Sequence, residues 1–298
     1  MLVKKEHIAS IIVLYKPNIK YLKKILKQHL INFSKVLLIN NSPEVALDCF
    51  ISNKVVIVNN AENIGLAKAI NVGIIEAEKH NLRMVALFDQ DTSLSNDFLS
   101  NMIKYINKYV KSNKIAVFAP VYFNRVTNHY GSIINFSPFR LLRTMPKKNT
   151  DFYYPHYVIT SGSFIFLKTI KDVGFMTNKL FIDFVDIEWC LRARAKGYDI
   201  VSFPQVEMAH QMGEYSVSFL GTNYPIHSPL RMYYYFRNAI YLYRLRELDW
   251  NWRVVDATRN LFRFLFYMVF VKNRPTYFKY IIKGYYHGLI KRMGKLEE

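Results

Sequence analysis

The sequence predicts an α/β fold in which helices flank a mostly parallel sheet, followed by a helical C-terminal region. In the first half, short apolar runs rich in β-branched residues alternate with segments of helical spacing. This alternation, with short connections, is typical of a parallel sheet covered on both faces. After residue 228 the strand signals give way to long segments rich in aromatic and basic residues. We therefore expect a sheet domain over residues 1–228 and a helical region over residues 229–298.

The expected strands of the first half cover Ile8–Tyr15, Val36–Ile39, Val55–Val58 and Met84–Phe88. The first helix follows the first strand, where apolar residues recur at helical spacing from Leu22 to Leu30. Strand signals are weaker between about residues 116 and 165. Ligands of parallel sheets bind at the carboxyl ends of the strands, so the polar residues after each run are the candidates for a site.

Four helices are expected in the second half of the chain. The first covers Val185–Lys196 and stops at Gly197, since glycine commonly ends helices. The other three are expected at Leu230–Arg246, Trp252–Lys272 and Thr276–Met293. Pro275 separates the last two, because proline cannot continue a helix.

Composition excludes several classes of protein. Hydrophobic residues make up 51% of the 298 residues and charged residues 21%, which excludes global disorder. The two cysteines, Cys49 and Cys190, have no CxxC spacing, which argues against a disulfide scaffold or a structural zinc site and suits a reducing cytoplasm. The N-terminal apolar run is too short for a signal peptide and lacks a small-residue cleavage site. The best membrane candidate, Phe264–Val271, is far shorter than the roughly 18–20 residues of a spanning helix.

The formal charge of +19 indicates an anionic partner: nucleic acid, a membrane surface or a phosphate-rich substrate. From Leu230 to Glu298, fourteen Lys and Arg residues stand against five Asp and Glu residues, interleaved with aromatic side chains. Basic residues with interfacial aromatics are what a helix lying on an anionic membrane needs. Nucleic-acid binding uses similar residues, so composition alone does not choose between them.

The sharpest motif is Leu87-Phe88-Asp89-Gln90-Asp91-Thr92, in which an apolar strand ends in two carboxylates one residue apart. Such carboxylates can converge on one cation beyond the sheet edge. Magnesium held by one or two carboxylates typically completes its shell with substrate phosphates and water. The alternative is a structural turn, with Asp91 capping a helix that starts near Leu94.

A second motif, Asn63 to Gly73, opens a helix after the third strand. Its small residues permit close approach of a ligand, and a helix N-terminus attracts anionic groups. The alternative is a helix packed tightly against the sheet, which needs Ala and Gly for the same steric reason. The motif matches neither GxGxxG nor GxxxxGK[ST], so dinucleotide binding and a P-loop are not supported.

Two further motifs carry titratable side chains. Asp183, Asp186 and Glu188 stand at the start of a helix, where the helix dipole favours their charged form. A carboxylate kept ionised there can act as a general base towards a sugar hydroxyl. The alternative is capping, with Asp183 as the N-cap and the other two as first-turn charges. His210 follows a strand-like run and precedes Gly213, which is compatible with a metal or phosphate contact.

In this order and spacing the motifs resemble those of family 2 glycosyltransferases with a GT-A fold, and among these the bacterial L-rhamnosyltransferases of O-antigen and capsule assembly. The resemblance runs from about Ile8 to Arg246. Its specific pieces are VLYKPN (13–18), INNS (39–42), ENIGLAKAINVGI (62–74), LFDQDT (87–92), TSGSFIF (160–166), FIDFVDIEWCLRARAKGY (181–198), AHQMGE (209–214) and LRMYYYFRN (230–238).

The resemblance implies roles for individual residues. A nucleotide-binding pocket would be lined by Tyr15, Pro17, Asn40, Asn41, Asn63 and Lys68. Asp89 and Asp91, with Gln90 between them facing the donor, would hold Mg²⁺ or Mn²⁺ on the diphosphate, and His210 would contact the metal or the leaving diphosphate. Asp186 would be the general base, preceded by Val185 where the family usually has Glu. Ser161, Gly162, Glu188 and Trp189 would position the acceptor or the donor sugar.

The implied reaction is an inverting transfer of L-rhamnose from dTDP-L-rhamnose to a polyprenyl-diphosphate-linked glycan acceptor. The implied location is peripheral, on the cytoplasmic side of the bacterial inner membrane, where the helical region contacts anionic lipid or a second copy of the chain. One alternative keeps the fold and mechanism but takes a UDP-sugar with galactofuranose, glucose or N-acetylglucosamine. The other is a non-catalytic nucleic-acid-binding protein. It leaves the acidic motifs unexplained, so no nucleic-acid partner is expected.

Overall fold

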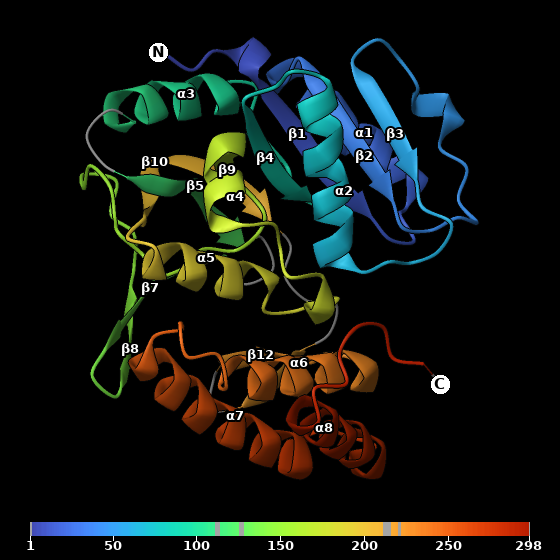
Figure 1. The fold of residues 1–298 in the computed structure, drawn as a ribbon, viewed down its shortest axis with the longest axis vertical. Helices are drawn as coiled ribbons and strands as arrows, with labels where there is room; N and C mark the ends of the chain where they lie inside the picture. Colours follow the sequence, from blue (N-terminus) through green and yellow to red (C-terminus); the bar gives the residue numbers. More distant parts are fainter. Residues whose placement is uncertain (1, 111–113, 125–127, 211–215, 220–221, 298) are drawn as a thin grey trace.

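The computed structural model describes residues 2–110, 114–124, 128–210, 216–219 and 222–297, and for residues 210, 216–219 and 222–225 it describes the backbone alone. The sheet and its helices form one layered body, with three helices of the C-terminal region below it (Figure 1). The strands are β1 (Ile8–Leu14), β2 (Lys35–Asn40), β3 (Val55–Asn59), β4 (Met84–Asp89), β5 (Ile115–Asn124), β6 (His129–Tyr130), β7 (Ile133–Ser137), β8 (Arg140–Thr144), β9 (Ser163–Phe166), β10 (Asp199–His210), β11 (Ser216–Phe219) and β12 (Thr222–Pro225).

The α-helices are α1 (Ile19–Asn32), α2 (Leu66–Lys79), α3 (Phe98–Tyr109), α4 (Leu167–Val173), α5 (Val185–Ala195), α6 (Pro229–Leu242), α7 (Trp250–Phe270) and α8 (Arg274–Leu289). Short 3-10 turns cover η1 (Lys5–His7), η2 (Asp48–Phe50) and η3 (Asn178–Leu180). The four strands expected in the first half are confirmed to within about two residues at each end, as is the helix that stops before Gly197.

The main sheet has the strand order β10-β5-β9-β4-β1-β2-β3, with β6 added beside β5. Strands β4, β1, β2 and β3 are mutually parallel, whereas β9 runs antiparallel to both β4 and β5. Strands β1, β2 and β4 are almost entirely buried, as strands covered on both faces must be, whereas the edge strand β3 is only partly buried. The sheet is therefore mostly parallel, as expected.

Each face of the sheet has its own apolar core. One core joins alternate side chains of the strands to α2, α4 and α5, and it also takes in Ala239 and Leu242 of α6. The other joins the opposite set of strand side chains to α1 and α3. Because α6 contributes to the first core, the C-terminal region is packed onto the sheet domain and the chain does not separate cleanly at residue 228.

Two glycines explain how closely α2 approaches its neighbours. At Gly73 a Cβ atom would lie 2.6 Å from Ile11 on β1, so only glycine permits this packing distance. Gly65 has φ +82° and faces Phe181, where a Cβ atom would lie 2.5 Å from the ring. The small residues of this motif therefore serve tight packing, as the structural alternative predicted.

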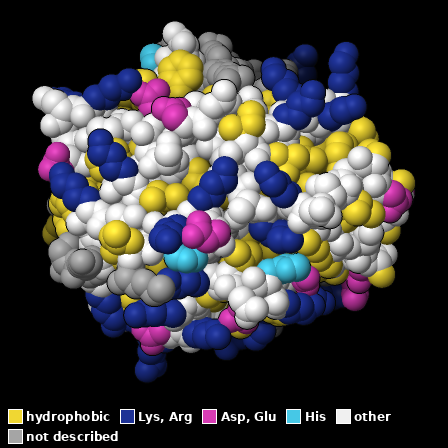
Figure 2. Space-filling view, turned by 90° about the horizontal axis from the view of Figure 1, so that it is seen from above, with side chains coloured by type: hydrophobic (Ala, Val, Ile, Leu, Met, Phe, Trp, Pro, Cys, Tyr) yellow, Lys and Arg dark blue, Asp and Glu magenta, His cyan; other side chains and the backbone are white. Residues whose placement is uncertain are grey.

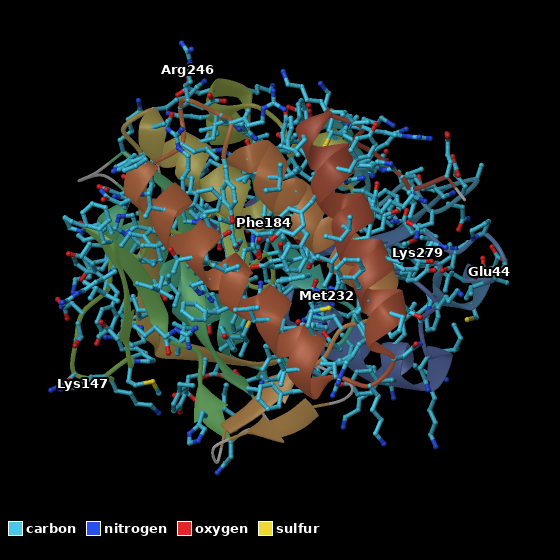
Figure 3. The ribbon with its side chains drawn as sticks, turned by 90° about the horizontal axis from the view of Figure 1, so that it is seen from below. Glu44, Lys147, Phe184, Met232, Arg246 and Lys279 are labelled. Carbon is cyan, nitrogen blue, oxygen red and sulfur yellow. The ribbon has the colours of Figure 1, made fainter. Side chains whose placement is uncertain are left out.

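The helices α6, α7 and α8 cover the lower side of the molecule, with α7 and α8 outermost (Figure 3). In α8, Gly284 and Gly288 face the backbone of α6, and a Cβ atom on either would lie 2.6 Å from a carbonyl oxygen of that helix. Among the helices that the structure describes, none is long and apolar enough to span a bilayer. The opposite face, seen from above, carries basic side chains scattered among polar and apolar ones (Figure 2).

Candidate active site

The site lies at the carboxyl edge of the parallel strands. The register of the sheet pairs Val13 with Asp89 and Leu14 with Asn40, so the residues that follow β1, β2 and β4 emerge side by side. Asp89 is the last residue of β4, and the DxD motif therefore projects beyond the sheet edge. This is the position where open α/β sheets bind their ligands.

Gln90 fastens the DxD motif to the end of β1. Its side-chain Oε1 accepts a hydrogen bond from the Tyr15 N–H at 2.9 Å, and its Nε2 donates to the Tyr15 carbonyl at 3.1 Å. Both ends of the amide are thus used by one backbone residue. Gln90 therefore holds the DxD loop against the end of β1.

Two consecutive residues before β9 join the DxD motif to Asp186. The backbone N–H of Thr160 donates to Asp186 Oδ2 at 3.0 Å. Next to it, the buried Ser161 hydroxyl accepts from the Asp89 N–H at 3.3 Å and bonds the Thr92 hydroxyl at 2.6 Å. The sheet edge therefore holds Asp89 and Asp186 in one fixed frame, and Ser161 serves that frame from inside the protein.

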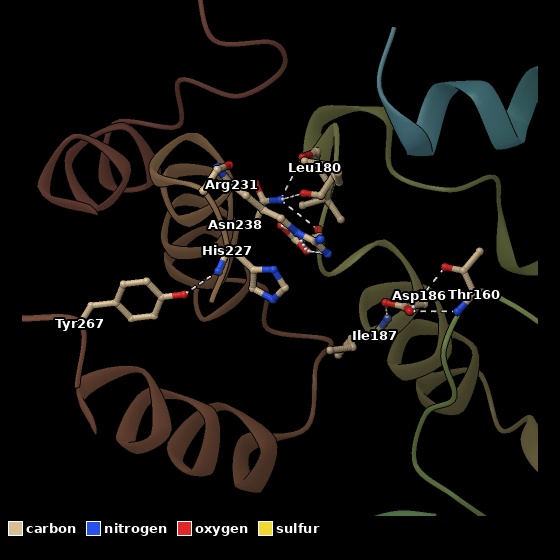
Figure 4. Close-up of polar contacts among 11 residues, drawn as sticks. Thr160, Leu180, Asp186, Ile187, His227, Arg231, Asn238 and Tyr267 are labelled. Carbon is tan, nitrogen blue, oxygen red and sulfur yellow. Dashed lines mark hydrogen bonds and ion pairs between the residues drawn. The ribbon is translucent and has the colours of Figure 1, made fainter. Parts of the chain in front are cut away.

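Asp186 lies in the first turn of α5 with both carboxylate oxygens bound. Oδ2 accepts from Thr160 and Oδ1 accepts from the Ile187 N–H at 2.9 Å (Figure 4). Burial raises the pKa of the Asp186 carboxyl to about 6, the two backbone N–H groups lower it in part, and the charge of Asp89 raises it further. A carboxyl with this pKa is largely ionised at neutral pH and close to the value that suits a general base.

The carboxylates fit a divalent cation that is completed by a ligand. Asp89 is close enough to Asp186 to raise its pKa, so the site carries an excess of negative charge that a cation would offset. No group of three or more His, Cys, Asp or Glu side chains converges within the described part of the chain. Such a sparse set matches Mg²⁺ or Mn²⁺ sites in which one or two carboxylates are supplemented by phosphate oxygens.

The predicted nucleotide-pocket residues divide into a structural and an exposed group. Asn40 and Asn41 are buried: Asn40 bonds Asn59 and the Val45 carbonyl, and Asn41 bonds Asn60 and the Gly65 carbonyl. Asn63 accepts from the Gly65 N–H at 2.9 Å within its own turn. These amides shape the loops after β2 and β3 from within.

The exposed members of the set are Tyr15 and Lys68, whereas Pro17 is buried. The Tyr15 ring is 48% exposed at the end of β1 and lies under the Lys16 ammonium, 5.5 Å from the ring centroid. Lys68 is in the first turn of α2. An exposed ring and a cation beside the DxD edge are suited to a base and a phosphate, respectively.

The N-terminus of α2 is already occupied by the protein. The carbonyl of Phe181 accepts from the N–H groups of Leu66 at 2.6 Å and Ala67 at 3.3 Å. The expectation that this helix end binds an anionic ligand is therefore wrong for its first two N–H groups. A neutral carbonyl from the loop before α5 satisfies them.

The two N-cap assignments, Asp91 and Asp183, are also wrong, whereas Asp186 and Glu188 do lie in the first turn of α5. The helix after the DxD motif begins at Phe98 with Asp97 at the N-cap, six residues beyond Asp91. Asp183 has φ +62° and binds Arg231, and the N-cap of α5 is Phe184. Asp91 and Asp183 thus have no capping role.

Several predicted sugar-positioning residues lie in the core. Glu188 is 3% exposed and pairs with Arg192 at 2.7 Å, while the Trp189 N–H donates to the Gly174 carbonyl. Gly162 has φ +82° and packs against Met208 and Pro120. Glu188 and Trp189 are thus directed into the core, whereas the Gly162 N–H donates to the Leu87 carbonyl of β4, two residues before Asp89. The side chain of His210, the predicted metal contact, falls outside the described residues.

Three residues near the site carried no sequence prediction. Thr160 binds Asp186, and Arg231 and Asn238 of α6 bind the loop 181–184 that leads into α5. They lie within the TSGSFIF and LRMYYYFRN pieces of the family resemblance. That resemblance marked the two segments but did not indicate which residues they bind.

The Glycosyl transferase family 2 model matches residues 11–172, which include the second half of β1, the DxD motif and Thr160–Ser161. The chain belongs to glycosyltransferase family 2. It is also 30% identical over 276 residues to the dTDP-rhamnosyl transferase RfbF of Shigella flexneri, covering 92% of each chain. Within family 2, the chain is thus similar to a rhamnosyltransferase along nearly its whole length.

Solved structures bear out the fold of this glycosyltransferase. S. aureus TarS 1-349 in complex with UDP-GlcNAc matches with a TM-score of 0.58 and 13% identity, over 96% of this chain and 82% of the other. GalNAc-T7 with UDP, GalNAc and Mn²⁺ matches with a TM-score of 0.55 and 14% identity, over 86% of this chain. The match spans only 55% of the GalNAc-T7 chain. At this identity the likeness concerns the fold, which is GT-A.

Proposed function

We propose that this family 2 glycosyltransferase transfers L-rhamnose from dTDP-L-rhamnose to a lipid-linked or polysaccharide acceptor with inversion at the anomeric carbon. The observation that carries the proposal is the pairing of Asp89 and Asp186 in one frame through Ser161 and Thr160. One carboxylate stands where a donor diphosphate is bound in an α/β sheet, and the other has the properties of a base.

In the proposed reaction an acceptor hydroxyl oxygen attacks the anomeric carbon while the bond to the diphosphate oxygen breaks. Asp186 takes the hydroxyl proton in the same step, so no charge accumulates on the attacking oxygen. Attack from the side opposite the leaving group inverts the configuration. The bonds from Thr160 and Ile187 fix the orientation of the carboxylate before the acceptor arrives.

Asp89 and Asp91 would hold the metal ion, Mg²⁺ or Mn²⁺. When bound, such an ion supplies positive charge that stabilises the leaving nucleoside diphosphate. Arg231, whose charge interacts with Asp89, adds a protein cation on the same side. Tyr15 and Lys68 would contact the nucleotide, and Gln90 holds Tyr15 in place for it.

The donor is proposed as dTDP-L-rhamnose because the relative similar over 92% of both chains is a dTDP-rhamnosyl transferase. The alternative is a UDP-sugar donor, because the TarS structure contains UDP-GlcNAc and the GalNAc-T7 structure contains UDP and GalNAc. A mass-based screen of dTDP- and UDP-sugars against a polyprenyl-diphosphate-linked glycan separates them. Product from dTDP-L-rhamnose alone is expected, and product from a UDP-sugar alone would overturn the donor assignment.

We propose that α7 and α8 lie on an anionic membrane surface, which carries the acceptor. Exposed apolar residues recur on these helices at spacings of three or four, which places each set on one stripe of its helix. The stripes are Leu261, Leu265 and Val269, with Phe262 beside them on α7, and Phe278, Ile282, Tyr286 and Leu289 on α8. The exposed cations Lys272, Arg274 and Lys279 flank the two stripes. Apolar stripes bordered by cations match a helix pair lying in the headgroup layer of an anionic leaflet.

A further inference from the structure

The loop that leads to Asp186 has an unfavourable backbone conformation. Phe181, Asp183 and Phe184 have φ values of +65°, +62° and +64°, a region that residues other than glycine rarely adopt. Three such residues within four positions persist only where the surroundings hold them. Asp186 follows two residues later, so the direction in which α5 starts depends on this loop.

Asn238 of α6 supplies the main restraint on the loop. Its Nδ2 lies 2.9, 2.7 and 3.0 Å from the carbonyl oxygens of Leu180, Ile182 and Asp183 (Figure 4). Its Oδ1 accepts from the Arg237 guanidinium at 2.9 and 3.0 Å, which fixes which end of the amide faces the loop. Asn238 and Arg237 are both fully buried.

Other side chains of α6 hold the same loop. Arg237 also donates to the Leu180 carbonyl at 3.0 Å, and Tyr234 stacks on the Phe181 ring at 4.9 Å. At the solvent side Arg231 binds the Asp183 carboxylate, with contacts of 3.0 to 3.3 Å to its oxygens. The third strained residue, Phe184, packs against the ring of Tyr235, which also belongs to α6. Each strained residue of the loop is therefore in contact with a side chain of α6.

Helix α6 is itself held rigidly by the outer helices. The α8 residues Gly284 and Gly288 let that helix contact the α6 backbone at Tyr233 and Arg237, the turn that carries Asn238. At the start of α6, the His227 N–H donates to the Tyr267 hydroxyl at 3.1 Å and its carbonyl accepts from Tyr277 at 2.9 Å. The restraint on the loop thus extends through α6 to α7 and α8.

We infer that Asn238, supported by Arg237, is a positioning residue that sets the Asp186 carboxylate for transfer, which makes the C-terminal helices part of the catalytic unit. The inference rests on the proposed role of Asp186 as the base. It differs from a packing role because it concerns one step: Asn238 contacts the loop backbone and none of the residues proposed to bind the donor, so we expect its loss to act on transfer rather than on donor binding.

The test compares full-length variants by turnover, by KM for donor and acceptor and by calorimetric affinity for dTDP with Mg²⁺. In Asn238→Leu the three carbonyl contacts are lost at similar side-chain volume. We expect kcat to fall at least tenfold while the affinity for dTDP changes less than threefold. Asp183→Asn keeps a residue that tolerates a left-handed backbone and weakens only the Arg231 pair, because the neutral amide loses the ionic attraction. It is expected to lower kcat several-fold with the same unchanged affinity.

Asn107→Leu is the matched control, because Asn107 also clamps backbone groups, the N–H and carbonyl of Val3, away from the carboxyl edge. Its kcat should stay within twofold of the wild type. In an Asp186→Asn background, Asn238→Leu should cause no further loss of turnover. Wild-type kcat in both Asn238→Leu and Asp183→Asn, or a parallel loss of dTDP affinity, would overturn the inference. If Asp186→Asn alone keeps full turnover, it is the proposed function that fails.

Discussion

The side-chain amide of Gln90 binds the backbone of Tyr15 at both ends, with N···O distances of 2.9 and 3.1 Å. This pair joins the DxD loop to the end of β1, across which a nucleotide would lie. Breaking it frees the loop that carries Tyr15 without removing any proposed ligand contact. We therefore expect Gln90 to affect donor binding through the position of Tyr15.

For Gln90→Leu we expect about tenfold weaker binding of dTDP, because two hydrogen bonds that order the loop are lost, at about 1 kcal/mol each at most in net terms. Calorimetry measures the affinity, and Gln205→Leu, which releases backbone carbonyls at 148 and 150, is the control. Unchanged affinity in Gln90→Leu would show that the Tyr15 loop is not part of the nucleotide site.

Asp91→Asn and Asp89→Asn are expected to abolish the effect of Mg²⁺ or Mn²⁺ on dTDP binding. The wild type should bind dTDP at least tenfold more tightly with the metal than with a chelator, since the cation joins the carboxylates to the diphosphate. Asp151→Asn, an exposed carboxylate paired with Lys108, should keep the full metal effect. Equal wild-type affinities with metal and chelator would rule out the metal site.

Asp186→Asn is expected to lower turnover by two or more orders of magnitude while dTDP affinity stays nearly constant. The amide oxygen can keep only one of the bonds to Thr160 and Ile187, because these N–H groups bind different carboxylate oxygens, and the amide cannot accept a proton. Were Asp186 only a helix-terminal charge, the substitution would cost about 1 kcal/mol of stability and leave turnover intact. Melting and turnover measured on one preparation distinguish the two results.

Turnover should fall as the pH is lowered through about 6, because the base must be ionised and burial raises the pKa of Asp186 to about 6. This fall in turnover should occur at lower pH when the metal is saturating, since a cation on Asp89 cancels the repulsion that raises the pKa of Asp186. The contribution of Asp186 to folding stability depends on pH in the opposite direction to turnover. The folded carboxyl binds its proton more tightly than the unfolded one, so this contribution to stability declines as the pH rises from 3.8 to about 6. A flat profile of kcat from pH 5 to 8 would contradict the role.

The α7–α8 stripes should bind vesicles rich in anionic lipid in a salt-sensitive manner. Replacing Phe262 and Leu289 by Glu removes two exposed apolar anchors and adds repulsion from the lipid, so flotation should fall at least fivefold at low salt. Phe139→Glu changes a ring of similar exposure (68% against 66%) on the β7–β8 turn and is the control. An equal effect of the control, or no flotation of the wild type, would refute the membrane role and favour packing or a second copy of the chain.

Local pattern by itself determined the strands β1 to β4, the helix starting at Val185 and the three C-terminal helices, because apolar periodicity and breaking residues act over a few positions. It did not reveal the parallel pair β5 and β10. It also marked the DxD motif and the acidic group of Asp183, Asp186 and Glu188, while the choice of Asp186 as the base came from the family resemblance. Pattern did not separate Asp186 from Glu188, which stand two residues apart with the same charge.

Only the tertiary structure decided which carboxylate faces the site. The α-helical turn directs Asp186 toward Thr160 and the DxD edge, while Glu188 turns to Arg192 in the core. Tertiary packing likewise places the Phe181 carbonyl against the first N–H groups of α2. It also places Asn238 against the strained loop, whose carbonyls lie 55 to 58 residues earlier in the chain. Such partners are set by long-range packing, and no local periodicity encodes them.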